Sequence, residues 1–176
     1  MKKLALSLAA LAFAAVPAVA SAQTASATVT ASATVQASLT ASTTHQLKFG
    51  TLAMGTSSTL TAHGTGQSSL SGLSTAGLGQ IQVGHNSNVS ATATIPTVLT
   101  NATTSQTLGF TANCGIASAS GGPATTANCA ALSFNVTAPG TVQSTYVLVG
   151  GTVTGSAAAG VGTFTGDIDF TFTATN

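Results

Sequence analysis

The sequence predicts an all-β protein, an antiparallel β-sandwich preceded by one long extended strand. The 176-residue chain contains 33 Thr, 33 Ala, 20 Ser and 19 Gly, whereas it has no Glu and only 3% charged residues. Thr favours strands, and the residues that build amphipathic helices are scarce. Short runs of alternating apolar and polar residues, separated by turn residues, cover most of the chain, as is typical of sandwiches.

The first residues have the pattern of a secretory signal peptide. Lys2 and Lys3 precede an apolar run over residues 4–16, and Ala20-Ser21-Ala22 matches a cleavage site made of small residues. A membrane anchor is the alternative, but about 20 apolar residues are needed to span a bilayer and this run is shorter. We therefore expect residues 1–22 to be removed on export to the bacterial periplasm, cell surface or an extracellular fibre, with no membrane span afterwards.

The exported chain has almost no charge. Lys48, Asp167 and Asp169 are the charged side chains that remain after residue 22, so there is no basic patch and nucleic acid is not an expected partner. Asp167 and Asp169 are near enough on one strand to bind a cation or to act in acid/base chemistry. The alternative that we favour is that these charges prevent unwanted pairing of an otherwise adhesive strand.

Cys114 and Cys129 are the only cysteines in the chain. Export to an oxidising compartment predicts a disulfide between them, closing a loop of about 15 residues. Two free thiols or half of a metal site are the alternatives. The loop contains neither His nor a carboxylate to complete a metal site, so the pattern favours the disulfide.

The stretch that follows the signal peptide alternates strictly. Every odd position from Ala25 to Ala41 is apolar and every even position from Ser26 to Ser42 is Ser, Thr or Gln. This period of two predicts a strand with one small apolar face and one hydroxyl face. Seventeen residues would span roughly 56 Å, whereas strands of globular domains usually have about 3 to 10 residues. We therefore expect part of this strand to leave its own domain.

A strand of this kind is suited to joining the sheet edge of a neighbouring molecule. In such strand donation, main-chain hydrogen bonds supply affinity and alternate side chains fill a groove. A flexible linker rich in Ala, Thr and Ser is the alternative, but a linker requires no alternation. We expect residues 23–42 to act as a donor strand whose interface consists of Ala27, Val29, Ala31, Ala33, Val35, Ala37 and Leu39.

Residues 43–176 are expected to form one β-sandwich domain. Eight short runs predict its strands, namely 47–52, 58–62, 81–83, 89–95, 108–114, 132–136, 146–153 and 164–174. The last run places Phe164, Ile168, Phe170 and Phe172 on one face. This face either forms the core at the C-terminal strand or borders an open groove that accepts a partner strand.

The side chains needed for an enzyme are scarce, and we expect no enzymatic activity, no cofactor and no metal site. No two histidines among His45, His63 and His85 have the i, i+4 spacing of a metal pair, and we expect all three to be exposed polar residues. The segment Gly72-Leu73-Ser74-Thr75-Ala76 lacks the second Gly of a nucleophile elbow.

Two blocks of sequence resemble known families. Leu47-Lys48-Phe49-Gly50 is similar to an "L-x-F-G" signature, and Val149-Gly150-Gly151-Thr152, Ala157-Ala158-Ala159-Gly160 and Gly162-Thr163-Phe164-Thr165-Gly166 are similar to a "VGGTL … AAG … G-aromatic-T-G" ending. Both signatures occur in a family of secreted bacterial β-sandwich domains of unknown function. The first also resembles spore-coat-U-type pilins of archaic chaperone–usher systems, although this chain has no cysteine shortly before it.

The resemblance implies an immunoglobulin-like, pilin-like domain. Its partners would be further copies of the chain or related pilin subunits, with a periplasmic chaperone and an usher for assembly. The function expected is then that of a structural subunit of a fibre, pilus or surface coat, built by strand donation. A monomeric secreted module that binds carbohydrate or a surface is the alternative, but such sites favour exposed aromatic residues, and the chain has no Trp and one Tyr.

Overall fold

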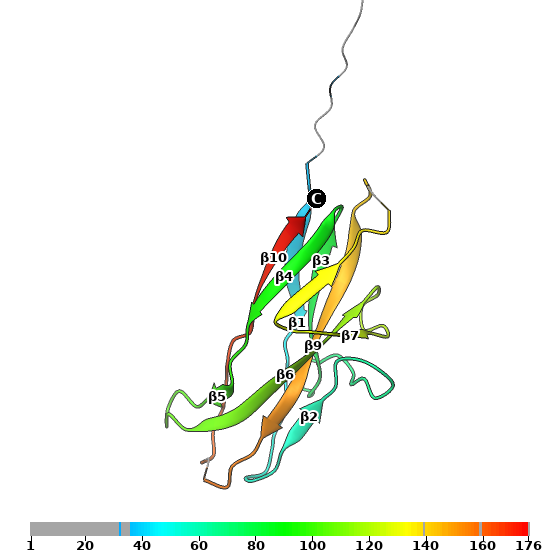
Figure 1. Ribbon diagram of the computed structural model, residues 1–176. Helices are drawn as coiled ribbons and strands as arrows, with labels where there is room; N and C mark the ends of the chain where they lie inside the picture. Colours follow the sequence, from blue (N-terminus) through cyan, green and yellow to red (C-terminus); the bar gives the residue numbers. More distant parts are fainter. Residues whose placement is uncertain (1–31, 33–35, 139, 159, 176) are drawn as a thin grey trace, which may run out of the picture. The chain divides into compact units, whose positions relative to one another are not determined.

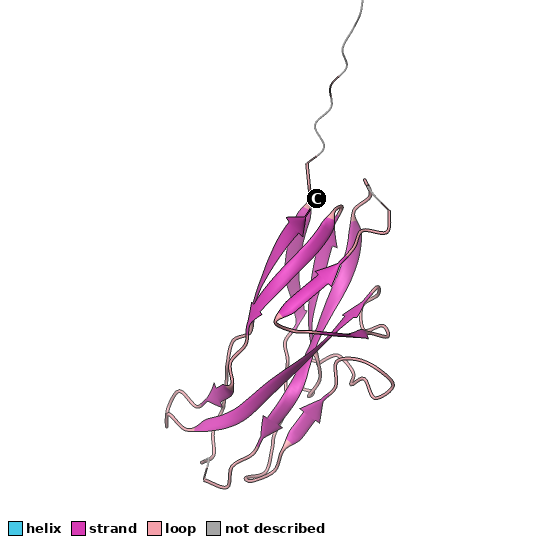
Figure 2. Ribbon diagram, viewed as in Figure 1, coloured by secondary structure: helices cyan, strands magenta, loops and turns pink. Residues whose placement is uncertain are grey.

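The structure, a computed structural model, describes residues 32, 36–138, 140–158 and 160–175. Strands and loops make up this part of the chain, and no helix occurs in it (Figures 1 and 2). All strand pairs are antiparallel, so the predicted all-β fold is confirmed. The predicted signal peptide, residues 1–22, lies outside the described residues. No helix in the described ranges could cross a membrane.

Seven strands form the larger sheet. Its central pair is β6 (Thr107–Ala117) and β9 (Gln143–Thr154), the two longest strands of the described chain. β9 pairs on its other edge with β3 (Gly79–His85) and β2 (Ser58–Leu60), and β3 pairs with β1 (Leu39–His45). Beyond β6 lie β5 (Val98–Thr100) and β7 (Thr125–Ala127).

The smaller sheet has three strands in the order β10, β4, β8. These are β10 (Asp169–Thr175), β4 (Asn88–Thr94) and β8 (Ala131–Phe134). Alternate residues of β10 are half-buried and exposed, and those of β8 buried and exposed, because one face of this sheet packs against the larger sheet and the other faces solvent. The two sheets form a β-sandwich.

The strand registers define two ends of the domain, which we name as they appear in Figure 1. Leu39 of β1 pairs with His85 of β3, and Thr175 of β10 pairs with Asn88 of β4. His85 and Asn88 flank the turn between β3 and β4. The start of β1 and the end of β10 therefore lie together at the upper end of the domain, and the end of β9 at Thr154 lies at the lower end.

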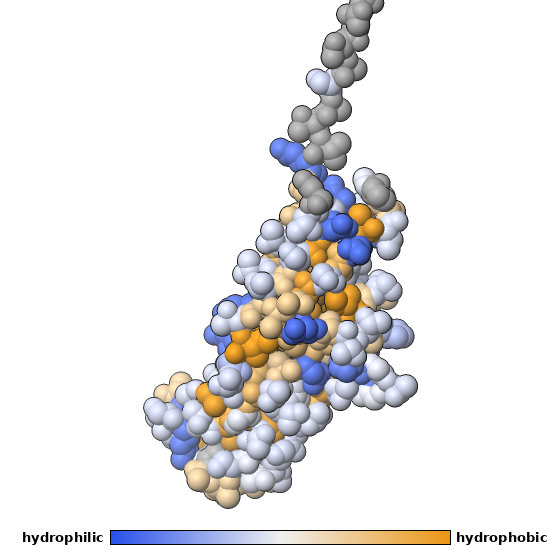
Figure 3. All heavy atoms as spheres, viewed as in Figure 1, coloured by the Kyte–Doolittle hydropathy of each residue, from blue (hydrophilic) through white to orange (hydrophobic). Residues whose placement is uncertain are grey.

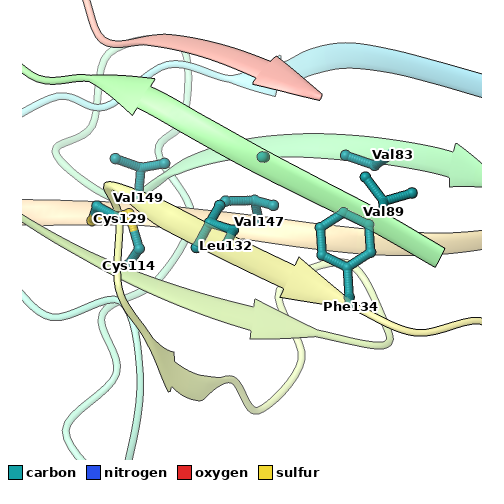
Figure 4. Packing of buried hydrophobic residues seen from close by; sticks show 9 residues of the cluster. Val83, Val89, Cys114, Cys129, Leu132, Phe134, Val147 and Val149 are labelled. Carbon is teal, nitrogen blue, oxygen red and sulfur yellow. A yellow bond between two sulfur atoms is a disulfide. The ribbon is translucent and has the colours of Figure 1, made fainter. Parts of the chain in front are cut away.

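The main hydrophobic core lies between the two sheets (Figure 4). Its buried members come from both layers, because inward-facing residues of β3, β6 and β9 meet those of β4 and β8. The cluster consists of Val83, Val89, Ala91, Cys114, Cys129, Leu132, Phe134, Val147 and Val149. Phe170 and Phe172 of β10 pack against it from the edge and are half-buried.

A second, smaller core covers the opposite face of the large sheet. Leu148 of β9 and Ala117 of β6 point away from the main core and are buried beneath two loops, together with Ala62, Leu78 and Ala124. The buried amide of Gln80 holds one of these loops, since its Nε2 donates to Ser120 Oγ and its Oε1 accepts from the Gly121 N–H. Both faces of the long strands are therefore packed.

The predicted disulfide between Cys114 and Cys129 is present and both cysteines are buried. It attaches β6 of the large sheet to the chain just ahead of β8 of the small sheet, so that it joins the two layers covalently. A disulfide in a domain of this kind is typical of proteins that fold outside the reducing cytosol.

Several strand boundaries differ from the predicted ones. Residues 47–52 form no strand. Their described pairing is a single bridge between Lys48 and Gly77, which continues the register of His45↔Gln80 just ahead of β3. Phe164 and Ile168 precede β10 instead of belonging to it. β5 and β7 are additional; at three residues each they are too short to show a period in the sequence.

His45 and His63 are half-buried, so the prediction that all three histidines are exposed is wrong, most clearly for His85. This residue is buried in β3, its Nδ1 lies 2.7 Å from the Ser87 carbonyl oxygen and its Nε2 lies 2.9 Å from Thr145 Oγ1. Its ring also contacts Phe134 edge-on at 5.1 Å between centroids. A buried imidazole is tolerated here because both ring nitrogens have partners.

Replacing both cysteines (Cys114→Ala, Cys129→Ala) tests the covalent link between the layers. Closure of a 15-residue loop contributes about 3 kcal/mol in the chain-entropy model, so the free energy of unfolding is expected to fall by about that amount. Urea denaturation measures it. A reducing agent should produce a loss of similar size in the parent protein and no change in the double variant; an unchanged urea midpoint in the double variant would contradict the assignment.

Candidate functional site

Strands β6 and β9 extend beyond the sheet that covers them. They pair from Gly109↔Thr154 to Ala117↔Tyr146, whereas β8 has 4 residues and β4 has 7. The disulfide places the start of β8 beside Cys114, so the part of β6 ahead of Cys114 has no β8 above it. The face of the large sheet that carries the main core therefore continues past the end of the small sheet, toward the lower end of the domain.

A groove of about 970 Å³ lies over this continuation. Its floor is formed by residues on the same face of the large sheet as the main core. Val149 and Val153 of β9 and Phe110 of β6 are buried in the floor, while Ile81 and Leu108 are half-buried. We refer to this feature as the groove. It is apolar at its base and continuous with the core.

One wall of the groove is the segment of residues 46–56 that follows β1. The L-x-F-G residues explain its course. Phe49 packs edge-on against Phe110 of the floor, with 6.0 Å between ring centroids. Gly50 has a φ of 75°, a left-handed conformation that favours glycine. Lys48 Nζ donates to the carbonyl oxygens of Gly72 and Leu73, which fixes the neighbouring loop.

The other wall is formed by the segment that leads into β10. Thr165 bridges to Thr100 of β5, and Phe164, Ile168 and Phe170 line the groove. Phe172 does not line it, but stacks on Phe170 with 6.0 Å between centroids. Of the four residues expected on a groove or C-terminal strand, three therefore line the groove and the fourth supports it.

Gly151 of β9 leaves room for the floor residue Phe110, whereas Gly150 leaves room for the Leu60 carbonyl oxygen on the opposite face. A Cβ atom at Gly151 would lie 2.6 Å from the Phe110 ring, which is closer than real Cβ contacts. Without a side chain at Gly151, the Phe110 ring can approach the strand closely. The second glycine of the "VGGT" block is thus explained by the packing of a groove residue.

The two walls continue into β1 and β10, and in the described part of the chain each of these strands has one edge without a strand partner. β10 pairs only with β4, and β1 pairs only with β3. The two strands approach each other as outermost strands of their sheets. An outermost strand presents unpaired N–H and C=O groups along its outer edge. The groove therefore combines an apolar floor with main-chain groups available for hydrogen bonding.

Two of the three charged side chains that remain after residue 22, Lys48 and Asp167, line the groove, and they have opposite signs. Figure 3 shows mostly pale residues, with orange apolar patches between them and few strongly hydrophilic ones. Asp167 lines the groove and Asp169 begins β10, and both carboxylates are exposed. Among the described residues, no three His, Cys, Asp or Glu side chains gather as metal ligands would. The arrangement suits an uncharged apolar segment better than an ion.

The structure places only the last part of the predicted donor segment. Leu39 begins β1 and packs against the main core of its own domain, and Ala37 is exposed just ahead of it. Ala27, Val29, Ala31, Ala33 and Val35 lie outside the described residues. The alternation of residues 25–41 therefore continues into a strand of the domain itself, and a donated strand would have to be drawn from the residues ahead of Gln36.

The chain joins the domain at the upper end, opposite the groove. The Ser38 N–H donates to Asn86 Oδ1 at 2.7 Å, and the Asn86 N–H donates to the Ser38 carbonyl oxygen. Asn86 Nδ2 also donates to the carbonyl oxygen of Gln36. The turn between β3 and β4 therefore fixes the direction of the chain at Gln36–Ser38. Sequence reasoning missed this role of Asn86, because a single Asn in a turn has no distinctive signal.

Comparisons with protein-family models, with curated proteins and with solved structures give no match for this chain. The geometry of the groove is therefore the basis for the function proposed below.

Gly151→Val tests the packing of the groove floor. The new side chain would collide with the Phe110 ring and with the Thr111 carbonyl oxygen, both 2.6 Å from its Cβ, and overpacking of this kind costs about 1–3 kcal/mol. Gly109→Val is the matched control, because its Cβ would lie 3.5 Å from Thr154 Cβ, an ordinary contact. Urea denaturation should show a clear loss for the first variant and a change within about 0.5 kcal/mol for the second. Equal losses would contradict the role assigned to Gly151.

Proposed function

We propose that the protein is a structural subunit of an extracellular fibre, pilus or surface coat, in which the groove of one subunit takes a strand from the N-terminal segment of the next. The observation that carries the proposal is the groove itself. It extends the hydrophobic core of the domain and lies between two outermost strands, which is the form of site that a β-strand fills.

The sequence ahead of Gln36 has the properties of the strand that the groove requires. Its odd residues are Ala or Val from Ala25 to Val35, so every second side chain is apolar and small. An inserted strand would place these side chains on the apolar floor and its hydroxyl residues toward solvent. Its N–H and C=O groups would pair with the free edges of β1 and β10 where these strands border the groove, which removes the cost of leaving them unpaired.

The N-terminal segment and the groove lie at opposite ends of the domain, which favours a neighbouring subunit as the donor of the strand. The segment joins the domain at the upper end, where Asn86 holds Ser38, and the groove lies toward the lower end. Contacts between two different surfaces of identical subunits repeat without closing when they lie at opposite ends, and so produce a filament. A pilin-like, immunoglobulin-like subunit exported through the periplasm, assembled with a chaperone and an usher, fits this arrangement.

The paired substitution Val29→Asp and Val35→Asp tests strand donation. Each carboxylate would be buried against the groove floor, and even 3 kcal/mol of this cost would weaken association by roughly 100-fold per site. Size-exclusion chromatography and negative-stain microscopy of the exported protein should show polymers for the parent chain and monomers for this variant. Leu39 is left unchanged, because it packs against the core of its own domain.

Thr28→Asp with Thr34→Asp is the matched control, since it adds the same charge to the opposite face of the same segment. We expect this control to polymerise like the parent chain. Circular dichroism and an intact disulfide verify that both variants are folded. A parent chain that stays strictly monomeric would favour a monomeric binding module. Polymerisation of the Val29/Val35 variant at the parental level would contradict strand donation.

A further inference from the structure

The described part of the domain exposes a few large apolar side chains, and three of them lie at its two ends. Val142 is 64% exposed in the loop ahead of β9, and Met54 and Val161 are 65% and 82% exposed beside the groove. Single exposed apolar residues need no explanation. These three, however, lie beside the two features of the proposed assembly, which are the groove and the point where the N-terminal segment joins the domain.

Val142 lies next to the point where the N-terminal segment joins the domain. It precedes Gln143, which pairs with His85 at the upper end. A Cβ atom built on Gly84 would lie 3.9 Å from Val142 Cγ1 and 2.7 Å from Thr40 Oγ1, so Val142 and the start of β1 flank the same glycine. The donated strand of a subunit would therefore leave the domain beside an exposed valine.

Met54 and Val161 lie on the rim of the groove. Both line it, and they come from the two loops that meet at the lower end, because a Cβ atom on Gly55 would lie 3.8 Å from Ala157 Cβ. A strand seated in the groove would leave past this apolar rim. If few residues separated the seated strand from the domain to which it belongs, that domain would lie directly against the rim.

The part of β6 that β8 leaves uncovered matches in length the part of the N-terminal segment between Val29 and Val35. The part of β6 ahead of Cys114 is residues 107–113, and the part of the N-terminal segment between its two valines is residues 29–35. Both contain seven residues, about 23 Å at about 3.3 Å per residue. With residues 29–35 seated over this stretch, Gln36–Ser38 and the Asn86 turn would stand at the rim of the groove.

We propose that successive subunits also contact each other end to end, with Val142 of one copy packed against Met54 and Val161 of the next. This inference rests on the proposed function, since strand donation is what brings the two ends together. The contact between Val142 and the pair Met54 and Val161 would be a second part of the interface between subunits, in addition to the donated strand. Burial of these three side chains would remove apolar area from water and limit the rotation of one subunit about the donated strand.

Cysteine cross-linking tests the end-to-end contact. Both native cysteines are in the disulfide, so cysteines introduced as Val142→Cys and Val161→Cys are the only ones available to a short bismaleimide. On non-reducing gels the double variant should give a ladder of covalent multimers. Each single variant should give none, because the interface joins two different surfaces.

Leu73→Cys combined with Val161→Cys is the matched control, since Leu73 is 100% exposed but lies on the loop held by Lys48. Polymers that form without a ladder above this control would overturn the end-to-end contact and leave strand donation intact. Absence of polymers from the parent chain would overturn both. A ladder that persists in the Val29→Asp, Val35→Asp background would support the contact and contradict its dependence on strand donation.

Discussion

The mismatch in length between the two sheets is the constraint on which the rest of the structure depends. β6 and β9 pair along a ladder from Gly109↔Thr154 to Ala117↔Tyr146, and the three strands that cover them are shorter. Apolar side chains on the uncovered part face a groove instead of a second layer. Because apolar surface is stabilised by removal from water, a segment that covers this floor would complete the core.

Several local features maintain the groove in an open form. The Cys114–Cys129 disulfide fixes where the covering sheet begins, and Gly151 leaves room for the Phe110 ring beside β9. The walls are held at a distance from each other, because Lys48 and Gly50 direct one of them and the Thr100↔Thr165 bridge holds the other. Each of these features favours a rigid cleft over collapse of the walls onto the floor.

Phe164 and Ile168, which were expected in the C-terminal strand, precede it, and residues 47–52 form no strand. The sequence did predict the disulfide and most of the strands whose apolar and polar residues alternate. These depend on local period and on composition, which a sequence displays directly. It did not predict that His85 is buried, because the partners of its ring, Ser87 and Thr145, are set by the packing of β3 against β9. Nor did it indicate where the small sheet ends, since the pairing of distant strands leaves no local signal. The position of the groove depends on that pairing.

The near absence of charged side chains after residue 22 favours the proposed assembly. With Lys48, Asp167 and Asp169 as the charged residues after residue 22, little repulsion opposes contact between copies. Cryo-electron microscopy of assembled filaments would test the central claim most directly. We expect density for residues 29–35 of one subunit lying between residues 46–56 of the next subunit and its segment that leads into β10. A groove left empty in the filament, or filled by the N-terminal segment of the same subunit, would contradict it.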